Sequence, residues 1–325
     1  MFNPNQKLNS KLFDADVEQV PIRKGFGEGL VAAGEADPAV VGLCADLTES
    51  TQMHLFRKKF PERFVEMGVA EQNMVSVAAA MAKQNLEVWV YSIAPFCYAR
   101  PFEQIRNDIC FHDLPVKLIG NGGGYGYGVM GPTHHAIEDY GILLALPNMS
   151  VYVPVFDQDL AVVIPRVGNE RSPAYLRLGR GEEQKGFEVP AYSPWRQLTS
   201  GKGKTVIAVG PIAGGLIAAF NKMPEDDCPN LWALAELPLS KNPLPLELLG
   251  QIASGSGLMV VEEHVARGSF ASELAIFLLN NGIAIGSFEH FNAQSHTYDF
   301  YGSQNYLRKQ SNLDVETICT AARGI

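Results

Sequence analysis

The chain has 325 residues with 46% hydrophobic content, which is sufficient for two α/β domains of ordinary size. Its formal net charge of −9 argues against a nucleic-acid or anionic-membrane surface. No apolar run approaches the roughly 18 residues that a membrane helix needs. The five cysteines are scattered and form no C-x-x-C pair, which favours a reduced, cytoplasmic compartment.

Predicted strands and helices alternate through the first half of the chain. Residues 1–20 are polar and are expected to form an arm. Periodicity predicts helices at 23–36, from 71 onward, at 96–111 and at 136–146. Apolar runs predict strands at 40–45, 87–91, 116–119, 149–153 and 174–178. The alternation indicates a doubly wound, mostly parallel α/β domain over residues 21–180.

A second α/β unit is predicted beyond residues 181–204, a polar stretch with Gly and Pro that is expected to be a linker. Strands are expected at 205–209, 231–234 and 257–261. Helices are expected at 213–220, 244–254 and 270–280. The fold class is therefore α/β, with a second doubly wound, mostly parallel domain over residues 205–325.

The stretch over residues 64–82 combines a Gly-containing turn with a long helical run of small and apolar residues. Glu71 falls in the first turn of this helix, where a carboxylate is favoured electrostatically. Its sequence neighbours include Val69, Met74 and Val75, and apolar surroundings would raise the pKa of the glutamate. Spacing alone leaves two interpretations open: a helix-capping carboxylate, or a proton-carrying group of an active site.

Three other short motifs are weaker signals. Residues 25–30 suggest a dinucleotide loop, but Leu30 stands where the last glycine is required. Residues 203–205 suggest a phosphate loop, but Leu198 stands where that loop needs its first Gly. Residues 131–139 hold two adjacent histidines and two acids, so a metal site stays open, although a helical His-x-x-x-His spacing is absent. A surface helix start is the simpler interpretation of that stretch.

Residues 68–73, Gly-Val-Ala-Glu-Gln-Asn, resemble the pyrimidine-domain signature of the transketolases and of their relatives, the deoxyxylulose-phosphate synthases. The resemblance covers nearly the whole chain and is strongest between residues 40 and 180. It implies that Glu71 hydrogen-bonds the aminopyrimidine ring of thiamine diphosphate, which promotes formation of the cofactor's ylid. It also implies that Phe96 packs on that ring and that Asp46 lies near the thiazolium and the subunit interface.

The loop Gly131-Pro-Thr-His134 resembles the transketolase Gly-x-Thr-His-Gln loop. The resemblance implies that His134 contacts the hydroxyls of a ketose donor and the reaction intermediate. The pKa range of histidine suits proton transfer during cleavage of a carbon–carbon bond. His135 stands where the family has Gln and is the next substrate-binding candidate.

Three further residues match substrate contacts of the family. Arg23 and Arg180 match phosphate-contacting arginines, whose donor forks suit phosphate, and Ser50 matches a serine hydroxyl of the same pocket. Two positions depart from the family. Met130 stands where an Asp recognises an acceptor hydroxyl, and Gly122 aligns with a histidine used for substrate phosphate. Both changes make the acceptor pocket more apolar and roomier, so the acceptor stays open.

The family's metal and diphosphate motif, Gly-Asp-Gly followed by Asn, belongs to an N-terminal domain and is not found in this sequence. The resemblance therefore implies a split transketolase, in which a separate partner subunit supplies the diphosphate-binding domain and most of the Mg²⁺ site. The expected assembly is an α2β2 heterotetramer. The expected reaction, within carbohydrate metabolism, transfers a two-carbon ketol unit from a ketose or ketose phosphate to an aldehyde or aldose.

Two rival interpretations remain open. The first keeps the cofactor but changes the reaction, to a decarboxylative transfer like that of the deoxyxylulose-phosphate synthases or to the β subunit of a 2-oxoacid dehydrogenase. The motifs around His134 and Asp46 favour the transketolase side. The second is a non-catalytic scaffold that keeps the fold, and the retention of Glu71 and His134 argues against it.

Overall fold

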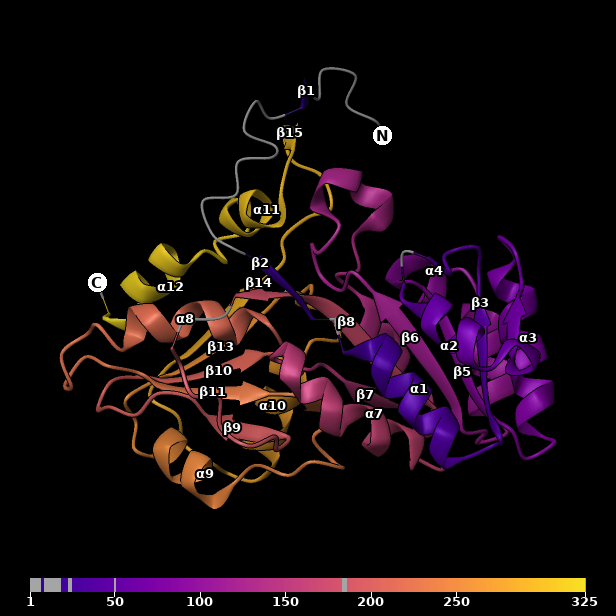
Figure 1. Ribbon diagram of the computed structural model, residues 1–325. Helices are drawn as coiled ribbons and strands as arrows, with labels where there is room; N and C mark the ends of the chain where they lie inside the picture. Colours follow the sequence, from indigo (N-terminus) through magenta and orange to yellow (C-terminus); the bar gives the residue numbers. More distant parts are fainter. Residues whose placement is uncertain (1–6, 9–18, 23–24, 50, 183–185, 325) are drawn as a thin grey trace.

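The computed structural model describes residues 7–8, 19–22, 25–49, 51–182 and 186–324. Figure 1 shows two α/β parts that lie side by side, one built mainly from the first half of the chain and the other from the second half. Each part has a mostly parallel sheet with helices on both faces. The fold class predicted from the sequence is confirmed.

The larger sheet contains eight described strands. In spatial order they are β12 (Glu236–Leu237), β7 (Ser150–Tyr152), β8 (Ala174–Glu182), β6 (Val116–Asn121), β5 (Glu87–Ile93), β3 (Val40–Cys44) and β4 (Phe64–Glu66), while β2 (Gln19–Ile22) pairs with β8. The pairs β7–β12 and β2–β8 are antiparallel, and the other pairs are parallel. Every residue of β3 and β6 is buried, as expected for parallel strands covered on both faces.

Two sets of helices cover this sheet. One face carries α1 (Phe26–Ala36), α2 (Met53–Lys59) and α7 (Leu160–Gly168). The other carries α3 (Glu71–Ala82), α4 (Ala94–Tyr98), α5 (Phe102–Gln104), the π-helix η2 (Ile105–Cys110) and α6 (Asp139–Leu144). Because side chains alternate along a strand, Trp89 and Tyr91 of β5 pack with the first set, whereas Val88 and Val90 pack with the second.

The smaller sheet is built from the second half of the chain. In spatial order its strands are β14 (Phe288–Asn292), β13 (Leu258–Glu262), β10 (Thr205–Val209), β11 (Asn230–Leu234) and β9 (Trp195–Gln197). Only the β9–β11 pair is antiparallel among them. One face is covered by α8 (Ile212–Phe220) and α12 (Val315–Ala322), and the other by α9 (Leu246–Ala253) and α10 (Phe270–Asn280).

The two parts share an interior. Strand β12 follows β11 in the chain and then joins the edge of the larger sheet through β7. One continuous apolar core contains Leu143 and Val153 next to Trp195 and Phe270. Short elements complete this junction: η3 (Gly128–Met130), η4 (Pro132–His134), β15 (Phe300–Tyr301) and α11 (Gln304–Gln310). Strand β15 pairs with β1 (Lys7–Leu8). The loops between β6 and α6 therefore rest on the second half of the chain.

The observed elements refine the predicted ones. The helix predicted at 96–111 is divided into α4, α5 and η2, with Pro101 at the division, because proline lacks the N–H that a continuous helix would use. Strand β9 lies inside the range expected to be a linker. Strand β4 and helices α2 and α7 were not predicted, and neither were the turns η1 (Pro61–Arg63) and η5 (Asp157–Asp159).

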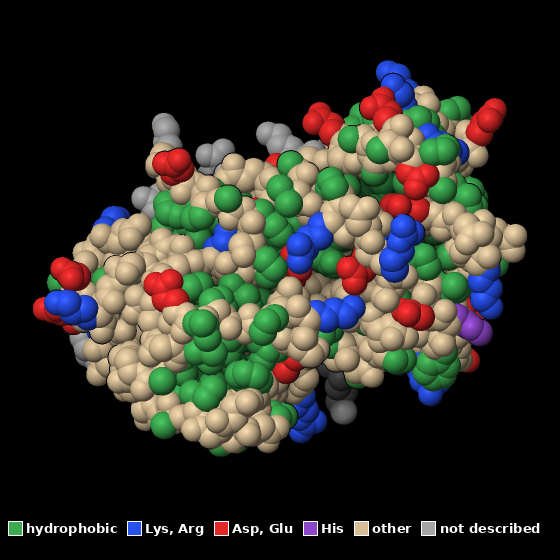
Figure 2. Space-filling model, turned by 90° about the horizontal axis from the view of Figure 1, so that it is seen from below, with side chains coloured by type: hydrophobic (Ala, Val, Ile, Leu, Met, Phe, Trp, Pro, Cys, Tyr) green, Lys and Arg blue, Asp and Glu red, His purple; other side chains and the backbone are tan. Residues whose placement is uncertain are grey.

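The surface offers one apolar region that is visible from below. Figure 2 shows hydrophobic side chains gathered at the lower left, over the region of α9 and α10. Leu246, Ile276 and Leu279 of these helices are all exposed. Among the residues described, the structure contains no helix with the length and apolarity that crossing a membrane requires.

Candidate active site

The candidate residues gather at the carboxyl ends of the parallel strands. Asp46 follows β3, Glu71 follows β4 after a short turn, Phe96 follows β5, and His134 lies in the long connection after β6. In open α/β sheets, ligands bind at this edge because all the strand-to-helix loops open there. The topology therefore brings together residues that are far apart in the sequence.

Glu71 is the first residue of α3, and its side chain is only 3% exposed. The guanidinium of Arg100 holds it: Nη1 of Arg100 donates to both carboxylate oxygens, each at 2.7 Å. Arg100 itself is 42% exposed, so this ion pair opens to solvent on one side. Sequence reasoning missed Arg100 and expected only apolar neighbours. Its position four residues after Phe96 was a usable signal, because residues four apart in a helical turn meet.

Phe96 lies at the centre of a small aromatic and cationic cluster. The guanidinium carbon of Arg100 lies 4.3 Å from the centroid of the Phe96 ring. The ring of His134 also meets Phe96 edge-on, with centroids 5.3 Å apart. The structure therefore brings Glu71, Phe96 and His134 into one connected group, with Arg100 as the fourth member.

His134 is suited to exchange protons near neutral pH. Its Nδ1 lies 3.0 Å from the hydroxyl of Thr133, and its ring is half-buried between Phe96 and Tyr127. Burial lowers the pKa of His134 below its usual value, so the imidazole is neutral at pH 7. A neutral imidazole with one oriented nitrogen can accept a proton from a hydroxyl that enters beside Phe96.

His135 contacts a different set of residues. It is 3% exposed, its Nε2 lies 3.4 Å from the carbonyl of Gly128, and its ring meets Tyr125 edge-on. The other face of the ring stacks on His296, at 6.0 Å between centroids and 10° between planes. Burial lowers the pKa of His135 to about 4. Its contacts support the loop from inside.

Glu138 links three elements around this loop. It forms a short contact with Nε2 of His296 and accepts a hydrogen bond of 3.1 Å from the hydroxyl of Tyr98. Burial opposes ionisation of Glu138, but the hydrogen bond and charge of His296 outweigh it and lower the pKa of the carboxyl. Because Tyr98 belongs to the helix that carries Phe96, Glu138 fixes that helix relative to the His134 loop.

The loop before His134 depends on glycine. Gly122 has a φ of 84°, and a β-carbon there would overlap the ring of Tyr127. The Tyr127 hydroxyl in turn accepts a hydrogen bond of 2.7 Å from Nδ2 of Asn121. The side chain of Met130 is 56% exposed at the end of the same loop.

Asp46 lies at the end of β3 with a φ of 55°. Its backbone N–H donates to Oε1 of Glu66 at 2.7 Å, and the hydroxyl of Thr48 donates to the other oxygen of Glu66 in a short contact. Glu66 thereby fixes the loop after β3 relative to the turn that leads to Glu71. Glu66 was not predicted from the sequence. The side chain of Asp46 is exposed and free to meet a ligand or a second chain.

The remaining candidates lie apart or outside the description. Arg180 is exposed near the end of β8 and lines a small crevice with Gly123 and Pro211. Arg23 and Ser50 fall outside the described residues. Within the described ranges no group of three or more His, Cys, Asp or Glu side chains is arranged to hold a metal ion. In the stretch 131–139, Asp139 forms an ion pair with Arg177, with 2.7 Å between Oδ2 of Asp139 and Nε of Arg177.

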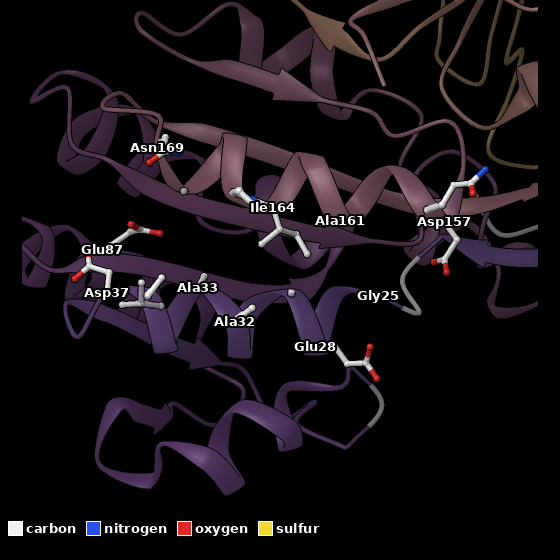
Figure 3. Close-up of a pocket in the computed structure, with 16 residues that line it drawn as sticks. Gly25, Glu28, Ala32, Ala33, Asp37, Glu87, Asp157, Ala161, Ile164 and Asn169 are labelled. Atoms are coloured by element: carbon white, nitrogen blue, oxygen red, sulfur yellow. The ribbon is translucent and has the colours of Figure 1, made fainter. Parts of the chain in front are cut away.

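A large groove lies elsewhere. It has a volume of about 610 Å³ and runs between α1 and α7, on the sheet face opposite to α3 and α4. Figure 3 shows Ala33, Ala161 and Ile164 along its middle, with acidic side chains, among them Glu28 and Glu87, toward its two ends. It contains none of the residues described above.

Comparisons with known proteins identify the family of the chain. Residues 18–184 match the family model described as "Transketolase, pyrimidine binding domain". A protein of Methanocaldococcus jannaschii described as "Putative transketolase C-terminal section" is 32% identical over 270 residues, which are 81% of this chain and 83% of that protein. A 1-deoxy-D-xylulose-5-phosphate synthase of Clostridium perfringens is 27% identical over 90% of this chain, but this chain spans only 47% of that enzyme's length.

Solved structures give the same result. A chain described as "Split gene transketolase, inactive beta4 tetramer" superposes with a TM-score of 0.79 and 29% identity, covering 94% of this chain and 99% of the other. A transketolase of Campylobacter jejuni superposes with a TM-score of 0.76 over 97% of this chain and 48% of its own. At 16% identity, that likeness concerns the fold.

Proposed function

Because the chain belongs to the transketolase family, we propose that it is the pyrimidine-binding and C-terminal subunit of a split, two-component transketolase. One observation carries the proposal: the guanidinium of Arg100 joins the buried carboxylate of Glu71 to the ring of Phe96, and that ring meets His134. The similarity to a split-gene transketolase, which covers 99% of that chain, supports the two-component form.

We propose that the chain is divided into two domains. Residues 21–180 form the pyrimidine-binding domain, after an arm over 1–20, and residues 205–325 form the C-terminal domain. Residues 181–204 connect the two, and β9 adds part of this connection to the second sheet. The C-terminal domain supports the site through His296, which contacts both Glu138 and His135.

The residues present fit the aminopyrimidine ring of thiamine diphosphate. The cofactor ring has to hydrogen-bond Glu71 and stack on Phe96. The flat, cationic guanidinium of Arg100 already makes both contacts, because it bonds the Glu71 carboxylate and lies over Phe96. Once bound, the cofactor supplies the carbanion chemistry of ketol transfer. Glu71 would hold a proton at the ring nitrogen, and Phe96 would keep one ring face dry.

The proposed reaction moves a two-carbon ketol unit from a ketose or ketose phosphate to an aldehyde. His134, neutral at pH 7, would accept and return the proton of a donor hydroxyl. Arg180 would bind the anionic end of a substrate. Arg23 and Ser50 are proposed for the same role from the sequence alone. His135 would keep the His134 loop in place, and the exposed Met130 would make the acceptor side apolar.

We propose that a separate subunit supplies the diphosphate-binding domain and holds Mg²⁺, in an α2β2 assembly located in the cytoplasm. The similarity to a chain described as a split-gene transketolase supports this division. The exposed Asp46, at the mouth of the site, would lie close to the second subunit.

Calorimetry tests the proposal directly. Thiamine diphosphate with Mg²⁺ should bind to the complex of this chain and its partner subunit and only weakly to the chain alone. In the assembled enzyme Glu71→Ala should lower ketol transfer at least about 100-fold, the lower end of the range for proton-transfer groups. Glu103→Ala, at an exposed acid on α5, is the matched control. Full activity of the Glu71 variant would overturn the proposed role.

A second reaction has a specific observation in its favour. The chain matches 1-deoxy-D-xylulose-5-phosphate synthases over 90% of its own length, so a decarboxylative transfer from a 2-oxoacid is the main rival. Release of CO₂ from pyruvate by the assembled enzyme would select this rival, and ketol transfer from a ketose without CO₂ would select the transketolase reaction.

A further inference from the structure

Arg100 makes the two contacts that the proposed function assigns to the aminopyrimidine ring. Its Nη1 donates to both oxygens of Glu71 at 2.7 Å, and its guanidinium carbon lies 4.3 Å from the centroid of the Phe96 ring. A guanidinium and an aminopyrimidine that is protonated at its ring nitrogen share the features that matter here, since both are flat, present N–H to a carboxylate and stack on aromatic faces.

The two groups cannot occupy this place together. The Glu71 side chain is 3% exposed, so its carboxylate is approachable from little more than the side that Arg100 occupies. The face of Phe96 over which the guanidinium lies is also filled. A pyrimidine ring that is to bond Glu71 and stack on this face of Phe96 needs the space of the guanidinium.

We propose that Arg100 occupies the aminopyrimidine site of the free chain and has to leave before the cofactor ring enters. The inference rests on the proposed function. Arg100 lies in the turn between α4 and α5, and 42% of its side chain is exposed, so the long side chain can rotate into solvent without moving a helix. Arg100 also keeps a buried carboxylate paired whenever the ring is absent, which matters because an unpaired buried charge is strongly destabilising.

The consequence is an affinity penalty that is specific to the free chain. When only a fraction of the molecules has an open site, the apparent affinity falls by that fraction. If Arg100 leaves the site open in one molecule in ten, removal of its guanidinium should tighten binding of an aminopyrimidine about ten-fold. Arg100 thus selects for ligands that compete successfully with an arginine for Glu71.

The test uses the full chain and a ligand that does not need the partner's diphosphate site. Calorimetry would measure binding of 4-amino-5-hydroxymethyl-2-methylpyrimidine to the wild type, Arg100→Ala and Arg100→Lys. We expect the alanine variant to bind about ten-fold more tightly than the wild type, and the lysine variant to lie between them, because lysine keeps the charge without the flat fork. The double variant Glu71→Ala/Arg100→Ala should lose the gain.

Arg106→Ala is the matched control. Arg106 is also exposed and also lies over a phenylalanine, 4.5 Å from the centroid of Phe111, but it hydrogen-bonds Asn107. Its removal should leave pyrimidine binding at the wild-type level. A second control restores the missing group: methylguanidinium added to Arg100→Ala should compete with the pyrimidine, whereas the wild type should not respond at the same concentration.

The outcomes separate this inference from the proposed function. Equal or weaker pyrimidine binding by both Arg100 variants, with wild-type melting curves, overturns the role of Arg100. Such a result leaves the proposed function standing, because that function is tested separately by thiamine diphosphate binding and ketol transfer in the assembled wild-type enzyme. If the alanine variant does not fold, the comparison of Arg100→Lys with the wild type decides the question by the same criterion.

Discussion

One ion pair makes the buried acid of the site compatible with a stable fold. A carboxylate that is 3% exposed would lose several kcal/mol of hydration without compensation. Arg100 compensates Glu71 from the solvent side, and Phe96 supports the guanidinium from below. The residue that stabilises the free chain is therefore also the residue that competes with a ligand.

Gly122 offers a prediction about the loop that presents His134. Gly122→Ala should lower the free energy of unfolding by about 1–3 kcal/mol, because φ is 84° and the new methyl group would overlap Tyr127. Urea titration would measure the change. Gly250→Ala is the control: it lies in α9 with open space around it and should stabilise by about 0.5–1 kcal/mol. Equal effects of the two substitutions would contradict the prediction.

At the scale of elements, apolar patterning located the buried strands but not the exposed or short ones. The predicted strands at 40–45, 87–91 and 116–119 are all observed, because runs of buried β-branched residues belong to parallel sheets. Strand β9 was missed because its three residues gain their pairing only from β11. Helix α7 was missed because Pro165 lies inside it, and proline normally ends a helix.

The candidate site could be predicted only where motifs carry it. Glu71, Phe96 and His134 were named from the sequence, and the structure places them together. Arg100 was missed although its spacing from Phe96 offered a local signal, and His296 was missed because its role depends on tertiary contacts that have no local pattern. His296 lies 158 residues from Glu138 in the sequence, and only the packing of the two parts brings them into contact.

The contact between the His134 loop and the 293–298 segment predicts a pH dependence. The pKa of His135 is about 4 in the folded chain and near 6.5 in the unfolded chain, so the unfolded chain binds more protons between these values. Stability therefore rises with pH across this window, and this residue should account for a loss of about 2 kcal/mol between pH 6.5 and 5. The groups that face His135 are His296, His134, Tyr125 and the Gly128 carbonyl.

Denaturant titrations at several pH values would test this dependence. His135→Gln removes the titrating group, so its free energy of unfolding should decline less than that of the wild type as the pH falls from 6.5 to 5. His112→Gln, at an exposed histidine, should decline in parallel with the wild type. Parallel curves for His135→Gln and the wild type would show that His135 does not titrate as inferred.

At the scale of the whole molecule, polar side chains join the two sheets beneath the site. The end of β13 is central: the Glu263 carboxylate accepts from Nε and Nη2 of Arg308, and its backbone carbonyl accepts from Nη2 of Arg177 at 2.9 Å. The neighbouring Glu262 accepts from the hydroxyl of Tyr140. Because Arg177 and Tyr140 belong to the part that contains the larger sheet, these bonds fix the orientation of the two parts.

Arg177 gives the prediction at this scale. It is 3% exposed and its Nε donates to Oδ2 of Asp139 at 2.7 Å, so Arg177→Met leaves a buried carboxylate without its cation. We expect the free energy of unfolding to fall by about 3–5 kcal/mol, as for other broken buried pairs. Hydrogen exchange should also show the two sheets opening separately, because the bond to the Glu263 carbonyl is lost.

Two further variants decide whether charge or packing is responsible. In Arg177→Met/Asp139→Leu no charge stays buried alone, so much of the lost stability should return, since apolar replacement of a whole buried pair is often neutral. The separate opening of the sheets should persist, because the Glu263 carbonyl still lacks its donor. Lys202→Met breaks an exposed ion pair and should change neither quantity. If the double variant stays as unstable as the single one, Arg177 stabilises the junction by packing, and the charge argument fails.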